Sequence, residues 1–230
     1  MSAEVIHSQD FVTDAVELIL AEAKAAIDAR GWFIMSLCGG GTPKPVYAAL
    51  AELGTHLPWD KVILTFGDER AVPPNHADSN YRMVNENLLS KVAIPEENVL
   101  RLKGELPPAE AADAAEAQLD ALATRLGALQ FKHDLILLGM GGDGHTASLF
   151  PASPALTVTD RRVVANYVEK LATNRLTFTY PFINAAQRIT FLINDSSKDV
   201  VVQEVLNKQG GHPSNGIEPV DGRLTFLLGY

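Results

Sequence analysis

The stretch FIMSLCGGGTPKPVY, residues 33–47, is an apolar run that ends in three glycines and leads into a helix-forming segment. Residues 33–38 predict a strand that is buried on both faces, because continuous apolar runs are typical of parallel sheets. Pro43 is typical of the first turn of a helix, which we expect over 43–53. A buried strand followed by a glycine turn and a helix indicates an α/β protein.

The rest of the chain repeats this alternation. Short runs rich in β-branched, aromatic or leucine side chains predict further strands at 61–68, 134–141, 161–168, 175–180, 188–194 and 223–230. Apolar residues at helical spacing and alanine-rich stretches predict helices at 9–30, 79–90, 107–130 and 196–208. Strands joined by helices need right-handed crossovers, so we expect a mostly parallel sheet with helices on both faces.

The composition is that of a folded protein, and 230 residues fit one large domain or two small ones. The chain is 47% hydrophobic and 20% charged, which excludes a disordered or fibrous protein. Cys38 is the single cysteine, so no internal disulfide can form and we expect a reducing, cytoplasmic compartment. Residues 1–12 lack a basic region and no apolar run reaches about 18 residues, so we expect neither a secretory signal nor a membrane span.

Acidic residues outnumber basic ones, with 28 Asp and Glu against 19 Lys and Arg and a net charge of −9. A negative surface repels a phosphate backbone, so we expect no nucleic-acid partner. A small anionic ligand would need a few cations gathered locally. In parallel sheets ligands bind beyond the carboxyl ends of the strands, and the residues that follow each strand are therefore the ones to inspect.

A glycine turn follows the first predicted strand. Glycines expose backbone amides, and a helix that starts here adds its dipole, so Gly40, Gly41 and Thr42 predict a phosphate cradle. A merely tight strand-to-helix turn is the alternative. The turn lacks the full glycine pattern of nucleotide-binding loops, which weighs against a dinucleotide-binding protein.

Three charged residues, Asp68, Glu69 and Arg70, follow the second strand. Charged side chains are rarely buried without partners, so their place at the end of a buried strand predicts either a ligand contact or an exposed loop with an internal ion pair. Two cations come later in the chain, Arg175 at the start of a strand and Lys198 near the start of a helix. Each alone is typical of surface charge.

The third strand leads into a glycine-rich loop that contains Gly142, Asp143 and His145. Histidine transfers protons near pH 7 without a large pKa shift, which makes His145 a candidate base, and Asp143 could orient its ring. Structural histidines are more common, but a glycine loop at the end of a strand favours function. The chain has no HExxH or CxxC motif, so we expect no metal.

Together these loops resemble those of the glucosamine-6-phosphate isomerase/6-phosphogluconolactonase family, and in particular its 6-phosphogluconolactonases. The motifs are CGGGTPKPVY (38–47), FGDERAVPPNHADSNYRM (66–83) and LLGMGGDGHTASLFP (137–151), in the same order and at matching spacing. RLTFTYP and the region around Lys198 extend the resemblance from about residue 10 to 208.

The resemblance implies a single Rossmann-like α/β domain over 1–230, similar to glucosamine-6-phosphate isomerase/deaminase. It implies a carboxylic ester hydrolase that converts 6-phospho-D-glucono-1,5-lactone to 6-phospho-D-gluconate, the second step of the oxidative pentose phosphate pathway, without a cofactor. We expect a sugar-phosphate lactone as the partner, and a monomer or weak dimer.

The expected site follows from the loops and the resemblance. His145 would be the general base and Asp143 would hold its ring or help to position water. The amides of 141–144, including Gly142, would stabilise the oxyanion, and Asp68 would pair with Arg70 or bind sugar hydroxyls. The phosphate would be bound by Gly40, Gly41, Thr42, Arg70, Arg175 and Lys198.

Two alternatives belong to other classes. A glucosamine-6-phosphate deaminase would resemble this chain in the glycine turn and in the glycine-rich loop around Asp143 and His145, which we call the DGH loop. It typically has a tyrosine at the position of Arg70 and a glutamate at that of Phe150. A non-catalytic sugar-phosphate sensor would be attached to a DNA-binding module, against which the short stretch before the first predicted helix and the acidic charge both weigh.

Overall fold

The structure is a computed structural model that describes residues 3–127 and 132–230. Its strands are β1 (Glu4–His7), β2 (Phe33–Leu37), β3 (Val62–Phe66), β4 (Asp68–Arg70), β5 (Val99–Leu100), β6 (Leu135–Leu138), β7 (Val163–Val168), β8 (Thr173–Phe178), β9 (Arg188–Ile193) and β10 (Arg223–Leu228). Its α-helices are α1 (Phe11–Arg30), α2 (Pro43–Leu53), α3 (Asn80–Asn87), α4 (Pro108–Arg125), α5 (Tyr180–Asn184) and α6 (Asp199–Leu206).

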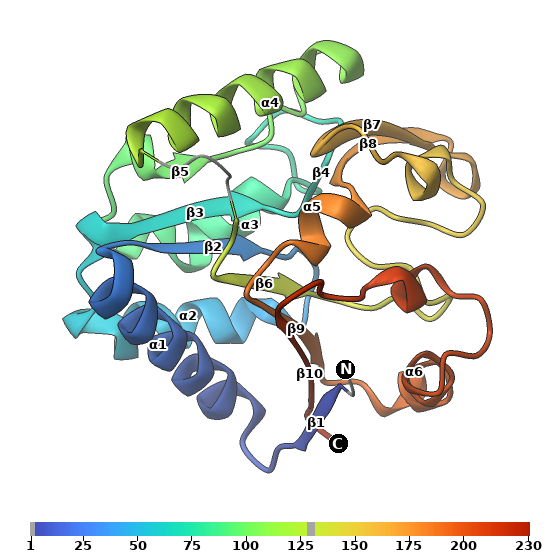
Figure 1. The fold of residues 1–230 in the computed structure, drawn as a ribbon, viewed down its shortest axis with the longest axis horizontal. Coiled ribbons are helices and arrows are strands. Elements are labelled where there is room, and N and C mark those ends of the chain that lie inside the picture. The colour runs from blue at the N-terminus through green and yellow to red at the C-terminus, as the bar shows by residue number, and fades with distance from the viewer. Residues whose placement is uncertain (1–2, 128–131) are drawn as a thin grey trace.

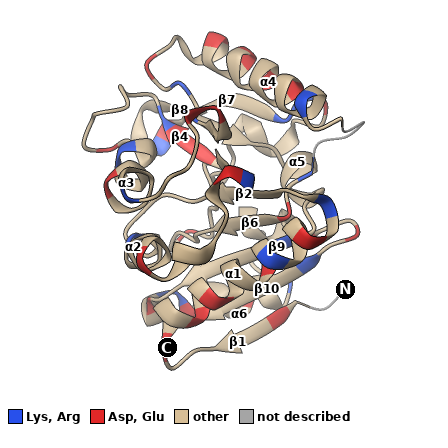
Figure 2. Cartoon of the chain, turned by 90° about the vertical axis from the view of Figure 1, so that its left-hand side faces the viewer, with Lys and Arg blue, Asp and Glu red and all other residues tan. Residues whose placement is uncertain are grey.

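The larger sheet has seven strands in the order β1-β10-β9-β6-β2-β3-β5 (Figure 1). All of its neighbouring strands are parallel. In the view of Figure 2, α2 and α3 lie on one side of β2 and β6, and α5 lies on the other. The predicted α/β architecture with a mostly parallel sheet is confirmed.

The centre of this sheet explains the apolar runs in the sequence. Every residue of β2, β3 and β6 is buried. Strand β2 pairs with β3 on one side and with β6 on the other, so its two faces are left for helices and loops to cover. Because the strands run in the same direction, their carboxyl ends reach one edge of the sheet, and the loops predicted to carry function begin there.

Helix α1 shows how the sequence sets an element's limits. It begins after Asp10, whose carboxylate accepts a hydrogen bond from the Thr13 amide at 3.3 Å. It ends at Gly31, whose φ of 80° belongs to the left-handed region that glycine adopts most easily. Its buried face consists of Phe11, Ala15, Val16, Ile19, Ala23 and Ala26.

A second, antiparallel sheet of three strands in the order β4-β8-β7 was not expected. The strands predicted at 161–168 and 175–180 exist as β7 and β8, but they pair with each other as a hairpin. The four residues between them are too few for the crossover that a parallel pair requires. The strand expected over 61–68 is β3, which ends at Phe66, and residues 68–70 form the separate strand β4 on the edge of this hairpin.

Other differences concern the limits of elements. Strands β1 and β5 are short and were not predicted. The helix expected over 107–130 is α4, which ends at Arg125, and residues 128–130 lie outside the described residues. The helix expected over 196–208 begins as a 3-10 turn, Ser196–Lys198, before α6. None of the helices in the described ranges combines the length and apolar content needed to cross a bilayer.

Candidate active site

A cavity of about 260 Å³ lies where β2, β3 and β6 end. It brings together the glycine turn, β4 and the DGH loop, which are far apart in the sequence. Most of the predicted site residues line it, namely Gly40, Gly41, Thr42, Asp68, Arg70, His145 and Lys198. Three of the predicted residues, Gly142, Asp143 and Arg175, do not line this cavity. The structure therefore brings the three predicted loops together at one edge of the sheet, as expected.

Asp143 and His145 form a close polar pair beside the cavity. Nδ1 of His145 lies 2.5 Å from Oδ1 of Asp143, and the other carboxylate oxygen lies 3.1 Å from Nζ of Lys170. Partial burial alone would raise the pKa of Asp143, but the hydrogen bonds from His145 and Lys170 outweigh it and lower this pKa to about 2. An ionised carboxylate only accepts hydrogen bonds, so the neutral form of the ring carries its proton on Nδ1 and has its lone pair on Nε2.

The DGH loop fixes the imidazole from several directions. The ring of His145 stacks on Phe150, with centroids 4.1 Å apart and planes 19° from parallel. The Gly141 amide donates to the carbonyl of His145 at 2.9 Å, and the Gly144 amide donates to the carbonyl of Gly141 at 2.9 Å. These two amides already donate hydrogen bonds within the loop. Of the amides of 141–144 that were expected to stabilise an oxyanion, those of Gly142 and Asp143 are therefore the remaining candidates.

The glycine turn supplies exposed backbone at the start of α2. Gly40 has a φ of 96°, a conformation that side chains strongly disfavour. Thr42 precedes the first residue of α2, Pro43, which also lines the cavity. The amides of this turn and the helix dipole therefore favour an anion in the cavity.

Cys38 lines the same cavity but is not a nucleophile. Its backbone N–H donates to the hydroxyl of Tyr47 at 2.9 Å, and this hydroxyl lies 2.9 Å from its carbonyl oxygen. Burial raises the pKa of the Cys38 thiol to about 12, so the thiol is neutral at physiological pH.

The charged residues of β4 divide into separate roles. Glu69, which is 2% exposed, accepts hydrogen bonds from the amides of Asn80 and Tyr81 at 2.8 Å each and from the Ser79 hydroxyl at 3.0 Å. It therefore caps the start of α3. Burial is the main influence on Glu69 and raises its pKa.

Asp68 accepts hydrogen bonds from the Ser148 hydroxyl at 2.6 Å and from the Asn80 side-chain amide at 3.1 Å. The guanidinium of Arg70 donates through Nη1 to the carbonyl of Asp78. Within the described part of the chain neither Asp68 nor Glu69 forms an ion pair with Arg70, so the expected internal ion pair is wrong for both carboxylates.

Two arginines lie side by side in the small sheet. Arg70 of β4 and Arg175 of β8 are direct partners in the antiparallel register. Like charges in this position repel each other, and burial followed by the nearby Arg70 lowers the pKa of Arg175. In the described residues the buried Nε atoms of both arginines have no hydrogen-bond acceptor. Figure 2 shows acidic and basic segments meeting at β4 and β8.

Lys198 lines the cavity from the turn before α6, with 24% of its side chain exposed. Its Nζ lies 3.9 Å from Oδ2 of Asp195. Its ammonium is thus available to a ligand in the cavity. Within residues 3–127 and 132–230, no three His, Cys, Asp or Glu side chains gather closely enough to hold a metal ion.

Several residues that support the site carry no sequence signal. Asn80 and Ser148 hold Asp68, and Tyr47 holds the turn at Cys38. Ser214, at the far end of the chain, donates through its amide and hydroxyl to the carbonyl of Gly144 at 2.9 and 2.8 Å. These contacts arise from tertiary structure, and the separation of up to 80 residues between partners conceals them in the sequence.

Comparisons with known proteins agree over nearly the whole chain. The family model described as glucosamine-6-phosphate isomerases/6-phosphogluconolactonase matches residues 7–226. The chain is 38% identical to a 6-phosphogluconolactonase of a Nostoc species, covering 99% of this chain and 95% of that protein. It is 40% identical to one of a Synechocystis species, covering 97% and 93%. The crystal structure of 6-phosphogluconolactonase from Thermotoga maritima has a TM-score of 0.87 at 28% identity, covering 99% of this chain and 100% of that chain.

Proposed function

The chain belongs to the family of glucosamine-6-phosphate isomerases and 6-phosphogluconolactonases, and from this membership we propose that it hydrolyses 6-phospho-D-glucono-1,5-lactone to 6-phospho-D-gluconate. Such an enzyme is a carboxylic ester hydrolase of the oxidative pentose phosphate pathway. Similarity to 6-phosphogluconolactonases along almost the full length supports this substrate. The mechanism rests on one observation, the 2.5 Å contact between Nδ1 of His145 and Oδ1 of Asp143 beside the cavity.

His145 acts as the general base in this proposal. Because Nδ1–H donates to Asp143, Nε2 is the free acceptor, and it takes a proton from water as the water oxygen attacks C1 of the lactone. A positioned general base typically accelerates such a step by about 10² to 10⁴. A lactone is already an activated ester, so the reaction needs no covalent nucleophile, which agrees with the neutral thiol of Cys38.

The second half of the reaction returns the proton. Attack at C1 gives a tetrahedral oxyanion, for which the amides of Gly142 and Asp143 are the candidate donors, at about 3 kcal/mol for a well-placed donor. The bond between C1 and the ring oxygen then breaks, and the proton held at Nε2 of His145 moves to the ring oxygen. The products are a hydroxyl group and a carboxylic acid, which ionises in water.

The phosphate group is bound at the opposite end of the substrate. The amides of Gly40, Gly41 and Thr42 and the cations Arg70 and Lys198 line the same cavity as His145. Arginine and phosphate form strong paired hydrogen bonds, and a dianion would relieve the repulsion between Arg70 and its strand neighbour. Arg175, which does not line the cavity, takes part by holding the Arg70 side of the site at a positive potential.

The stacking of Phe150 on His145 favours the lactonase over the deaminase. A glucosamine-6-phosphate deaminase would resemble this chain with a glutamate at position 150, where its carboxylate would handle protons during ring opening. Here an apolar ring, 8% exposed, lies against the imidazole at that position. Lactone hydrolysis does not need the missing carboxylate.

The proposal includes partners and location. A net charge of −9 disfavours nucleic acid, and the site takes a small sugar-phosphate lactone. The single, buried Cys38 is compatible with a reducing, cytoplasmic compartment. We propose a monomer or weak dimer.

A coupled assay tests the function. Glucose-6-phosphate dehydrogenase generates the lactone, and acid release is followed with and without the protein. We expect His145→Ala to lower kcat by about 10² to 10⁴ with the fold intact. His56→Ala, at an exposed histidine, is the matched control and should retain activity. Near-normal turnover in His145→Ala would remove the proposed base, and release of ammonia from glucosamine 6-phosphate would replace the lactonase with the deaminase.

A further inference from the structure

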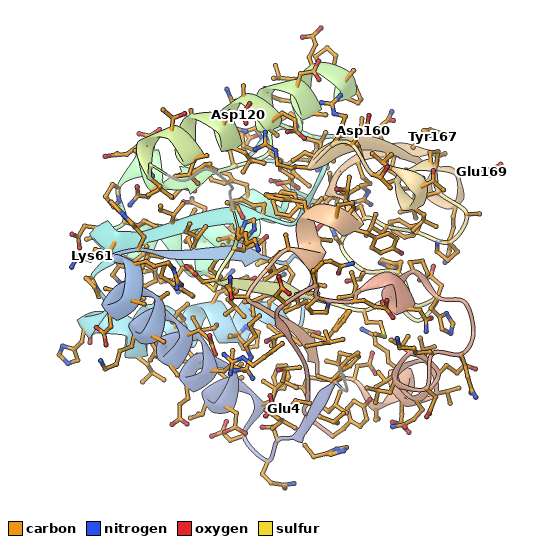
Figure 3. The ribbon with its side chains drawn as sticks, in the orientation of Figure 1. Glu4, Lys61, Asp120, Asp160, Tyr167 and Glu169 are labelled. Atoms are coloured by element: carbon orange, nitrogen blue, oxygen red, sulfur yellow. The ribbon has the colours of Figure 1, made fainter. Side chains whose placement is uncertain are left out.

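Asp143 also lines a second cavity, of about 730 Å³, which it shares with Phe150 and with the tip of the β7–β8 hairpin. The hairpin contributes Tyr167, Glu169 and Lys170 to this cavity. In Figure 3, Tyr167 and Glu169 lie at the outer edge of the molecule. The proposed mechanism uses no residue of the hairpin, although Lys170 of the hairpin contacts the carboxylate of Asp143.

The carboxylate of Asp143 is divided between two cationic or potentially cationic partners. Oδ1 lies 2.5 Å from Nδ1 of His145, and Oδ2 lies 3.1 Å from Nζ of Lys170. Lys170 sits in the 3-10 turn Glu169–Leu171, which the amide of Ala172 closes by donating to the carbonyl of Glu169 at 3.0 Å. The turn therefore holds the lysine over the carboxylate.

We propose that Lys170 is a positioning residue for the base: its ammonium anchors Asp143 and offsets part of the negative charge that Asp143 presents to His145. This inference rests on the proposed function, because it takes His145 as the base. A carboxylate beside an imidazole has two effects, since it orients the ring and also stabilises its protonated, inactive form. A cation on the other carboxylate oxygen leaves the imidazole ring oriented but weakens the stabilisation of its protonated form. The unprotonated imidazole, which is the active base, therefore persists to lower pH.

Other charged groups also face the base and stay unchanged when Lys170 is replaced. Asp68, Arg70 and Lys198 line the same cavity as His145. His212 approaches the loop from the other side, with Nδ1 3.4 Å from the carbonyl of Asp143 and Nε2 2.6 Å from Oε2 of Glu204. Glu169 lines the second cavity. Lys170 differs from these groups in contacting the carboxylate of Asp143 directly.

The exposure of Lys170 separates this role from a structural one. Its side chain is 71% exposed, and exposed ion pairs contribute little to stability. A merely structural contact therefore predicts small effects on folding and none on the pH profile. A charge effect on the base predicts a displaced pH profile that salt weakens, because an exposed charge is screened within about 10 Å at 0.1 M salt.

The test compares Lys170→Gln, Lys170→Arg and Lys24→Gln. Lys24 is a matched control, since it is 78% exposed and pairs with Asp28 far from the site. We expect Lys170→Gln to move the acid limb of kcat/KM to higher pH by about 0.3 to 0.7 units at low salt, with convergence at 1 M salt. Lys170→Arg keeps the charge and should restore the wild-type limb. An unmoved acid limb in Lys170→Gln, together with an unmoved His145 midpoint in the NMR titration below, overturns the proposal.

A second measurement needs no turnover. The ¹⁵N signals of the His145 ring, assigned by their loss in His145→Gln, are followed against pH in the same variants. If the NMR midpoint moves in Lys170→Gln while the kinetic limb does not, the effect of Lys170 is upheld and the base role of His145 fails. If neither moves, the Lys170 proposal is overturned, while loss of turnover in His145→Ala would still uphold the base.

Discussion

Gly141 and His145 lie so close together that a Cβ atom added to Gly141 would stand 2.1 Å from Nδ1 of the imidazole. The same Cβ would stand 2.8 Å from Oδ1 of Asp143. The pair at the centre of the site therefore fits only against a residue without a side chain. Gly141 is therefore needed for the geometry of the DGH loop because it has no side chain, and not only because glycine is flexible.

Gly141→Ala should lower kcat by about 100-fold, because a methyl group would displace the imidazole by an amount comparable to 1 Å. Gly142→Ala is the matched control: a Cβ at Gly142 meets nothing within 4 Å, and the backbone amide is kept. Steady-state kinetics on both variants, with circular dichroism to verify folding, measure the difference. Equal kcat values for the two variants would contradict the crowding.

Arg70→Ala should raise KM for the phosphorylated lactone by about 10- to 100-fold, the range expected for losing a hydrogen bond to a charged group. KM for unphosphorylated gluconolactone should change much less, since it offers no phosphate. Arg82→Ala serves as the control, because Arg82 is partly exposed and pairs with Glu86 on α3. A similar loss on both lactones would argue against a phosphate contact.

Asp143 should make stability depend on pH at the acid end. Its pKa is lowered to about 2 in the folded protein, below the ordinary value of an aspartate. Its contribution is therefore complete above about pH 4 and is lost as the pH falls through about 2. Urea unfolding of wild type and Asp143→Asn should differ by about 1 kcal/mol at pH 6, since solvent screens the contacts, and the difference should shrink toward pH 2. A difference independent of pH would contradict this linkage.

Glu69→Ala should destabilise the fold by about 2 to 4 kcal/mol, because it leaves several buried donors at the start of α3 without an acceptor. Glu69→Gln keeps one acceptor oxygen and should lose less. Chemical denaturation measures both, and Glu96→Ala, at an exposed glutamate, gives the baseline. A loss below about 0.5 kcal/mol in Glu69→Ala would show that water replaces the carboxylate at no cost.

The central sheet and most of the residues that line the cavity could be predicted because their signals are local. The run 33–38 must be apolar on both faces, and the glycines after it are contiguous with the strand they end. His145 is recognisable because Asp143 and the glycines lie within four residues of it. The ordered motifs then pointed to the family that the comparisons support.

The rest depends on contacts between distant segments. Strand β4 has three residues and exists only because β8, about a hundred residues later, lies beside it. Glu69 could not be recognised as a helix cap, since its partners come from Ser79 to Tyr81. The contact between Lys170 and Asp143 joins a hairpin tip to a loop 27 residues earlier. Neither composition nor periodicity encodes such pairings.

The pairing of β1 with β10 has a consequence for synthesis on the ribosome. Glu4 and Thr225 are register partners 221 residues apart, so β1 cannot find its place until β10 has emerged. Until then the edge of β9 and the apolar residues of β1 are open to other chains. Closing so long a loop is an entropically costly, late event, so these surfaces stay open until β10 has taken its place between β1 and β9.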